Sequence, residues 1–340
     1  MAGRVGRVLT GLARPGTRPA YVAAIRRRVS GKTAERTYRG ERCLVCGAAR
    51  PKVRDIASDK QPERVCSFHV CGSCGYVGNP GNLHDYRQFT DTSKLPLRAR
   101  VGTAERKGRE FHMAKMATSI LGRRNLEVIV FGAGRSFDNH HIEAFPQVRK
   151  VAVADIMKVR DDAEFIDLNE PAPRRFPLVL ASEVVEHFLE PRKDFEYLFS
   201  FVEADGLLVC STNIYDGGSI AKQPYIFIPG HVSYYTPRAL QVLAAANGFH
   251  VDFRAPLVAT GYGGPRKRYV LFSKSRAVMD AVPLYFGSHL FAPSEGPRAN
   301  VELAEQIARE QRESELRQAE LRRAASGDID LGQAERRATR

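Results

Sequence analysis

No stretch of this 340-residue chain approaches the roughly 18 consecutive apolar residues that a membrane-spanning helix requires. The composition is globular, with 43% hydrophobic and 26% charged residues. Cysteine is also scarce, and the six cysteines are grouped rather than scattered. Because no signal peptide is recognisable, we expect a cytoplasmic, reducing setting in which thiols bind metal rather than form disulfides. An integral membrane protein and a secreted disulfide scaffold are therefore excluded.

Acidic side chains are missing from residues 1–34, and residues 1–42 supply nine of the fourteen net positive charges. Short apolar clusters at helical spacing accompany this charge. Three interpretations stay open: a disordered tail, a peripheral anchor on anionic lipid at the inner face of the membrane, and a mitochondrial transit peptide, which the scarcity of serine disfavours. The remaining chain carries only +5 and lacks aromatic residues interleaved with a basic stripe, so nucleic acid is a disfavoured partner.

Four cysteines form two matching motifs, with Cys43 and Cys46 in CLVCG and Cys71 and Cys74 in CGSCG. A glycine after each pair allows a tight turn, and two such knuckles supply four thiolates for a structural Zn²⁺ ion. Cys66 and His69 are nearby substitutes that fit the repeated knuckle less well, and free thiols are the alternative. Cys210 lies in an apolar run and is interpreted as a core residue.

Residues 126–273 alternate β-rich runs with helical segments. The β-rich runs are LEVIVF, VAVAD, LVLAS, LLVCST, HVDF and YVLF. This alternation predicts a doubly wound α/β fold with a mostly parallel sheet, in which ligands bind beyond the carboxyl ends of the strands.

One strand ends in a glycine turn that suits a nucleoside. Gly132 and Gly134 follow LEVIVF, and Asp155 ends the next strand, where its carboxylate can accept from ribose hydroxyls. A dinucleotide site would require a third glycine at position 137, and that residue is Phe137. NAD is therefore disfavoured.

At these residues the chain resembles the class I S-adenosylmethionine-dependent methyltransferases, over about residues 104–253. The blocks that carry the resemblance, in the family's order, are FGAGRS, VAVAD, FIDLNE, LVLASEVVEHFLEP, VEADGLLVCSTN and HVSYYTPRALQVLAAANGFHV. The resemblance implies a seven-stranded Rossmann-like sheet and S-adenosylmethionine as cofactor. It also implies cofactor contacts for Gly132, Gly134, Ser136, Asp155, Asp167, Ser182 and Glu183.

Methyl transfer requires alignment, and it requires a base only when the acceptor must lose a proton. His187 follows the fourth strand of the resemblance, and His231 lies in the segment that the family places over its substrate. Both are candidate catalytic bases, because imidazole titrates near neutral pH. Each could instead be a structural histidine. Tyr234 and Tyr235, beside His231, are expected to hold a sugar ring.

A cysteine knuckle pair ahead of such a domain resembles bacterial sugar or surface-glycan methyltransferases. This implies O- or C-methylation of a small-molecule or glycan acceptor. An RNA base methyltransferase and a catalytically degenerate zinc-ribbon binding module remain the alternatives. The chain is expected to divide into a basic tail (1–40), a zinc-ribbon-like module (41–80), a linker and entry helix (81–125), the methyltransferase core (126–275), and an extension with a charged C-terminal helix (276–340).

Overall fold

The computed structural model describes residues 42–84, 101–254 and 267–291. The basic tail expected over 1–40 and the charged helix expected near the C-terminus, over 298–340, lie outside the described residues. Within the described part of the chain, no helix has both the length and the apolar character needed to cross a membrane.

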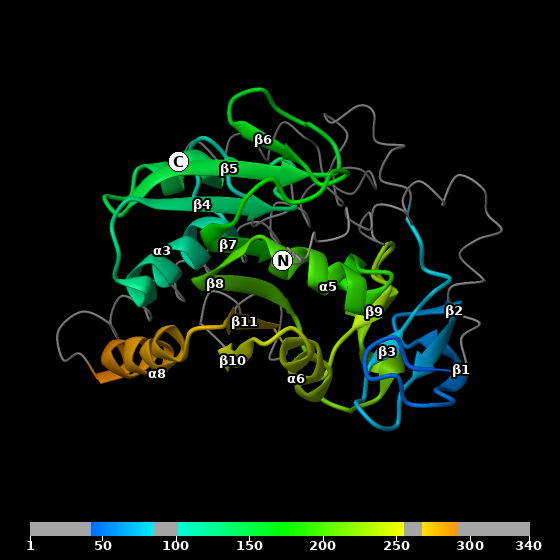
Figure 1. Cartoon of the computed structure of the whole chain (residues 1–340). Helices are drawn as coiled ribbons and strands as arrows, with labels where there is room; N and C mark the ends of the chain where they lie inside the picture. The colour runs from blue at the N-terminus through cyan, green and yellow to red at the C-terminus, as the bar shows by residue number, and fades with distance from the viewer. Residues whose placement is uncertain (1–41, 85–100, 255–266, 292–340) are drawn as a thin grey trace, which may run out of the picture.

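Seven strands form the main sheet in the order β10-β11-β8-β7-β4-β5-β6 (Figure 1). They are β4 (Leu126–Phe131), β5 (Val148–Asp155), β6 (Glu164–Asp167), β7 (Phe176–Ser182), β8 (Val202–Asn213), β10 (His250–Arg254) and β11 (Lys267–Ser273). The five strands from β8 to β6 pair in parallel, whereas β11 runs antiparallel to both β8 and β10. This confirms the predicted doubly wound, mostly parallel Rossmann-like sheet.

The central strands are almost continuously apolar because helices cover both faces of the sheet. In β4, Val128 and Val130 belong to one core cluster, whereas Ile129 and Phe131 belong to another. The first cluster contains residues of α3 (Arg109–Leu121), α4 (Asp138–Glu143) and α8 (Arg276–Phe291). The second contains residues of α5 (Pro191–Ser200) and α6 (Pro237–Ala246).

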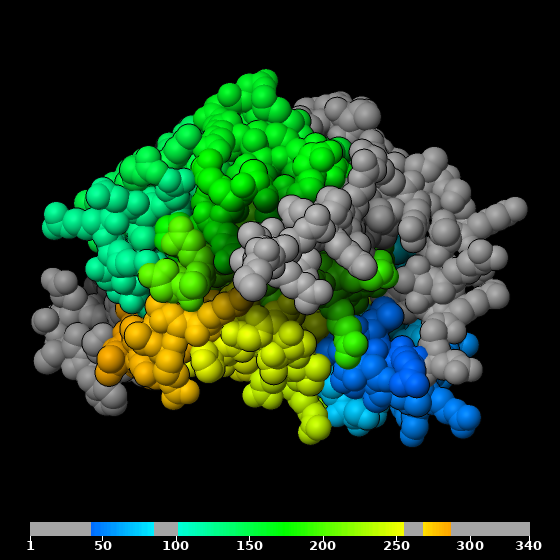
Figure 2. Space-filling view, in the orientation of Figure 1, coloured from blue at the N-terminus to red at the C-terminus, as the bar shows by residue number. Residues whose placement is uncertain are grey.

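A second, four-stranded sheet is built mainly from the N-terminal part of the described chain. Its order is β1-β2-β3-β9, with β1 (Lys52–Ser58), β2 (Gln61–Val70), β3 (Val77–Gly78) and β9 (Ser233–Tyr234). The last strand comes from a much later part of the chain, and Val77 pairs with Tyr234. Figure 2 shows the blue N-terminal residues lying directly against the green and yellow surface of the main body.

Three short 3₁₀ helices lie in the connections near this contact: η4 (Val185–His187), η5 (Ile220–Lys222) and η6 (Pro224–Phe227). A third core cluster joins Phe68 and Val77 of the small sheet to the aromatic residues of η6 and to Tyr234. The segment between β8 and α6 is therefore held between the two sheets, so that residues of η4 and of the loop before β9 can meet.

Candidate functional site

The glycine turn and the strand-end acid are in direct contact. Gly132 and Gly134 adopt φ values of +69° and +53°, in the left-handed region that favours glycine. The amide of Gly134 donates to Oδ2 of Asp155 over 2.8 Å, and the amide of Ile156 donates to Oδ1 over 2.7 Å. Burial raises the pKa of Asp155, and these amide hydrogen bonds oppose that increase.

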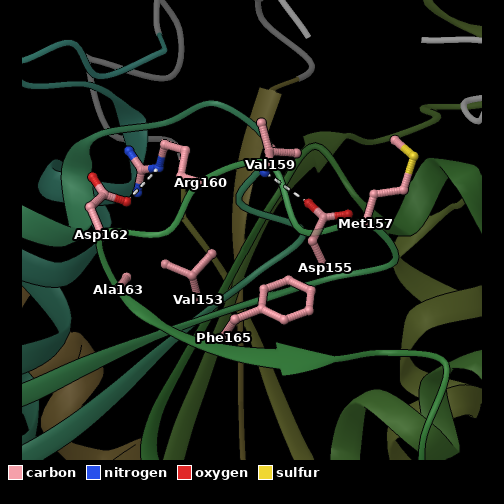
Figure 3. A pocket seen from close by; sticks show the side chains of 9 residues that line it. Val153, Asp155, Met157, Val159, Arg160, Asp162, Ala163 and Phe165 are labelled. Atoms are coloured by element: carbon pink, nitrogen blue, oxygen red, sulfur yellow. Dashed lines mark hydrogen bonds and ion pairs between the residues drawn. The ribbon is translucent and has the colours of Figure 1, made fainter. Parts of the chain in front are cut away.

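A pocket opens beside this turn (Figure 3). It is lined by Gly134, Val153, Asp155, Met157, Val159, Arg160, Asp162, Ala163 and Phe165. One wall carries Arg160 and Asp162, which form an ion pair of 3.2 Å, and Arg160 also donates to Asn139 of α4 over 2.5 Å. The pocket thus combines apolar side chains with the partly buried carboxylate of Asp155 at the carboxyl ends of β4 and β5.

Asp167 ends β6 beside Asp155, because the two acids are register partners in the parallel pair β5 and β6. It is exposed, and its Oδ1 accepts from the amide and the side-chain nitrogen of Asn169 over 2.8 and 2.6 Å. Asp167 lies outside the residues that line the pocket.

Ser136 is held by the start of α3. Its hydroxyl donates to Oε2 of Glu110 over 3.1 Å, and both residues are buried. Burial raises the pKa of Glu110 to about 7; Arg109 opposes this shift, and Asp138 adds to it. Asp138 in turn accepts from the amides of Gly108 and Phe111 over 2.7 and 3.0 Å. Hydrogen bonds to the buried carboxylates of Glu110 and Asp138 therefore hold the glycine turn against α3.

Ser182 ends β7 at the same edge of the sheet, and Glu183 follows it directly. Glu183 has φ +56°, accepts from Ser211 over 2.9 Å, and lies 4.0 Å from the guanidinium of Arg109. Burial alone would lower the pKa of Arg109, but Glu183, Glu110 and Glu186 together raise it. A fixed guanidinium therefore faces the strand-end acid.

The two candidate bases lie together, with ring centroids 4.9 Å apart. Nδ1 of His187 hydrogen-bonds to the carbonyl of Gly230 over 2.9 Å, and His231 is buried. Potential ligand atoms of Glu186, His187 and His231 all lie within 4.8 Å of one another. The hydroxyl of Tyr225 donates to Glu186 over 2.5 Å, and the Tyr225 ring packs against His231 with centroids 4.3 Å apart.

The expected role of the neighbouring tyrosines is wrong. Tyr234 and Tyr235 are almost completely buried, with 1% and 0% of their surfaces exposed. Tyr234 donates to the carbonyl of Ile214 over 3.2 Å, and Tyr235 donates to that of Val185 over 3.1 Å. These side chains fill two cores and fix the loop, so they are unable to hold a sugar ring at the surface.

Four residues of this site were not predicted from the sequence: Arg109, Glu110, Glu186 and Tyr225. Glu186 stands directly before His187 in a block that was recognised, so its position in that block was an available signal. Arg109, Glu110 and Tyr225 lie outside the recognised motifs, and only the packing of α3 and η6 brings them to the site.

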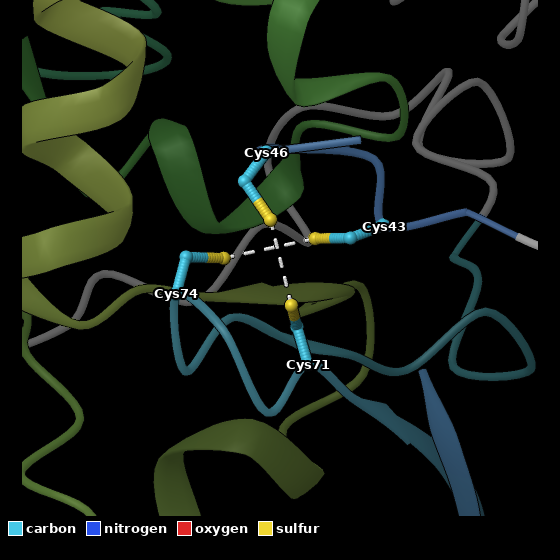
Figure 4. A group of neighbouring side chains, drawn as sticks. All are labelled: Cys43, Cys46, Cys71 and Cys74. Atoms are coloured by element: carbon cyan, nitrogen blue, oxygen red, sulfur yellow. Dashed lines mark hydrogen bonds between the residues drawn. The ribbon is translucent and has the colours of Figure 1, made fainter. Parts of the chain in front are cut away.

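The structure brings the four knuckle cysteines together from two segments (Figure 4). The sulfurs of Cys43 and Cys74 are 3.7 Å apart, and those of Cys46 and Cys71 are 3.5 Å apart. Four thiolates about 2.3 Å from a tetrahedral Zn²⁺ ion would be roughly 3.8 Å from one another, so the arrangement fits that metal. The hydrogen bond between Cys43 and Cys74 lowers the pKa of Cys43 to about 5 and raises the pKa of Cys74, so Cys43 is the thiol of this pair that ionises more readily.

Both knuckles turn as predicted, because Gly47 and Gly75 have φ +73° and donate to the carbonyls of Cys43 and Cys71 over 2.9 Å. Side chains of the main body hold the module in place. Arg192 of α5 donates to the carbonyl of Val45 over 2.7 Å, and the N-cap residue of α6, Thr236, donates to that of Cys74 over 2.5 Å. Three other residues lie apart from the four sulfurs: Cys66 and His69 on β2, and buried Cys210 on β8.

Part of the main body matches a known family profile. Residues 113–252 match the family profile described as a methyltransferase domain. No curated protein matches the chain.

Several solved structures that are similar to this chain are named as methyltransferases. A Burkholderia thailandensis 1,6-didemethyltoxoflavin-N1-methyltransferase with bound S-adenosylhomocysteine is 18% identical, covers 48% of this chain and 76% of its own, and has a TM-score of 0.37. The plantazolicin methyltransferase BpumL is 15% identical, covering 49% and 85%, with a TM-score of 0.38. Human N-acetylserotonin methyltransferase is 14% identical, covering 48% and 51%, with a TM-score of 0.35.

Proposed function

We propose that this S-adenosylmethionine-dependent methyltransferase methylates a sugar, either as a small molecule or as part of a glycan, at a position that must lose a proton. The observation that carries the proposal is the cluster of His187, His231 and Glu186 just beyond the carboxyl end of β7. An aligned methyl donor needs no base for a neutral nitrogen acceptor, whereas a hydroxyl or an acidic carbon does need one. The cysteine knuckles ahead of the domain resemble those of sugar methyltransferases, and this resemblance is the reason for proposing a sugar as the acceptor.

In this proposal the cofactor binds across the carboxyl edge of the sheet. Gly132 and Gly134 contact its methionine part, Asp155 binds the ribose, and Asp167 lies near the adenine. Ser136, Ser182 and Glu183 line the remainder of the site. Support comes from the contact between Gly134 and Asp155, and from the pocket that these two residues share.

The proton of the acceptor is taken at the histidine cluster. His231 is the preferred base, because it lies in the segment before β9 that the family resemblance puts over the substrate, and His187 is the second candidate. The hydrogen bond between Nδ1 of His187 and the Gly230 carbonyl requires a proton on Nδ1, since a carbonyl only accepts. Nε2 of a neutral His187 can therefore accept a proton.

We also propose that Cys43, Cys46, Cys71 and Cys74 hold one structural Zn²⁺ ion. With four thiolates the coordination sphere is closed, so no position is left for water and the ion has no catalytic role. Its contribution is to fold the module whose carbonyls Arg192 and Thr236 bind. The module in turn pairs with β9, directly after the segment that carries His231.

Two measurements test the proposed activity. Calorimetry with S-adenosylmethionine should show binding, and its absence would favour the catalytically degenerate zinc-ribbon module. Metabolite and glycan profiling of a deletion strain should then reveal an unmethylated sugar, which purified protein and methyl-labelled S-adenosylmethionine convert to the methylated form. Label recovered in RNA instead of in a sugar would support the RNA base methyltransferase and overturn the sugar acceptor.

A further inference from the structure

We propose that Glu186, His187 and His231 form a binding site for one first-row divalent transition-metal ion, separate from the cysteine cluster. Two imidazoles and one carboxylate are a recurring donor set for such ions, whereas Mg²⁺ and Ca²⁺ prefer oxygen ligands alone. The inference deepens the proposed function and rests on it in one respect: it places the ion where an acceptor oxygen would be methylated.

The three donors already lie close to the distances that a metal requires. Their ligand atoms are all within 4.8 Å of one another. Ligands about 2.1 Å from a tetrahedral ion are roughly 3.4 Å apart, so binding demands only small rotations of the side chains. The backbone is fixed, because the amide of Val232 donates to the carbonyl of Glu186 over 2.9 Å.

The surrounding hydrogen bonds orient these side chains as they do around known metal ligands. A ligating histidine commonly donates its other ring N–H to a carbonyl, and Nδ1 of His187 meets the carbonyl of Gly230 in this way. The carboxylate of Glu186 accepts from Tyr225 over 2.5 Å and from Thr212 over 3.4 Å.

The local charge also favours a cation. Glu186 is completely buried, and Glu183 lies near it, since both carboxylates interact with Tyr225 and with the guanidinium of Arg109. Burying a carboxylate is costly unless a positive charge compensates it. A divalent ion between Glu186 and the imidazoles would supply that charge beside Arg109.

Three protein ligands leave a coordination position for the acceptor, as in catalytic metal sites. A sugar hydroxyl bound there would lose its proton to water more readily, because the ion stabilises the alkoxide. The oxygen lone pair then forms the bond to the methyl carbon. The electron pair of the methyl–sulfur bond returns to sulfur, which releases S-adenosylhomocysteine. With the ion bound, His187 and His231 would act as ligands in place of the base role proposed above, and the acceptor atom would be oxygen.

Cobalt(II) titration tests the site in the full-length protein after the cysteine cluster has been loaded with a single equivalent of Zn²⁺ and unbound Zn²⁺ has been removed. We expect one equivalent of Co²⁺ to bind with visible ligand-field bands and without a thiolate charge-transfer band. Glu186→Gln and His231→Ala should each weaken Co²⁺ binding at least tenfold. Tyr225→Phe should weaken it by roughly 10- to 100-fold, which is the usual effect of losing an outer-sphere partner.

His141→Ala is the matched control, because His141 bonds to the carbonyl of Thr103 and should leave the Co²⁺ signal unchanged. Thermal melting verifies that each variant is folded. Equal Co²⁺ affinity in wild type, Glu186→Gln and His231→Ala, or no binding by wild type, overturns the site. S-adenosylmethionine binding is measured on the same samples. Cofactor binding without Co²⁺ binding removes only the metal site, and Co²⁺ binding without cofactor binding removes only the proposed function.

Discussion

The backbone amide of Gly134 donates a 2.8 Å hydrogen bond to the carboxylate of Asp155, 21 residues further along the chain. This bond joins the turn after β4 to the end of β5 and closes one side of the pocket. Because the carboxylate is already oriented by two amides, its remaining lone pairs have fixed directions. A ribose hydroxyl would thus meet a preorganised acceptor.

The glycine turn gives the first prediction. At Gly134 a new Cβ meets no atom within 4 Å, so Gly134→Val should remain folded despite its φ of +53°, while its branched side chain fills the space of the cofactor. We expect S-adenosylmethionine affinity to fall more than tenfold, about 1.4 kcal/mol, by calorimetry. In Gly132→Ala the Cβ would lie 2.6 Å from Val184, so this comparison variant should also melt at a lower temperature. Unchanged affinity in Gly134→Val would disprove the assignment of the turn.

The second prediction concerns the cysteine cluster. Purified protein should contain about one equivalent of Zn²⁺, measured by elemental analysis under conditions that leave the site of Glu186, His187 and His231 without metal. Cys43→Ser and Cys74→Ser should lower the metal content and destabilise the N-terminal module, because metal binding and folding of such modules are coupled. Cys210→Ser serves as control and should keep the metal, since Cys210 is buried in β8. A metal-free protein whose melting temperature does not respond to Zn²⁺ would rule the site out.

The third prediction concerns the histidine cluster. Replacement of the residue that removes the proton, preferably His231 and otherwise His187, by Ala should lower kcat by roughly 10²- to 10⁴-fold. Affinity for S-adenosylmethionine should change by no more than a few-fold, because the proposed cofactor contacts are made by other residues. Steady-state kinetics on the identified acceptor and calorimetry separate the two effects. If both Ala variants keep full turnover, the acceptor is a nucleophilic nitrogen, such as that of an amino sugar.

The fourth prediction follows from the raised pKa of Glu110. Its carboxyl keeps a proton up to about pH 7 in the folded protein, whereas the unfolded chain releases that proton near pH 4.5. The folded state therefore binds more protons between these values, and Glu110 lowers the free energy of unfolding as the pH rises through them. Above pH 7 its cost is full, at most on the order of 3 kcal/mol.

Urea denaturation at a series of pH values measures this effect. Glu110→Gln should remove that part of the pH dependence and should gain stability relative to wild type as the pH rises from 4.5 to 7. Glu196→Gln, at an exposed position of α5, is the matched control and should follow the wild-type curve. If the free energies of unfolding of Glu110→Gln and wild type changed with pH in parallel, the raised pKa of Glu110 would be contradicted.

The sequence alone determined the elements whose signals are local. Six β-rich runs became β4, β5, β7, β8, β10 and β11. The runs of the central strands are continuously apolar because a strand buried on both faces needs such a segment. The two Cys-x-x-Cys-Gly motifs formed matching turns because their signal is also local. The left-handed backbone at Gly47 and Gly75 depends only on a few adjacent residues.

Only the tertiary structure decided which of these residues meet. Tyr225 reaches Glu186 because η6 packs between the two sheets, and Ser136 reaches Glu110 because α3 folds back over the glycine turn. Tyr234 and Tyr235 turned inward because β9 completes the small sheet and the cores on both sides bury their rings. Such contacts join residues far apart in the chain, and their stability comes from burial and packing of whole elements, which no local pattern of residues encodes.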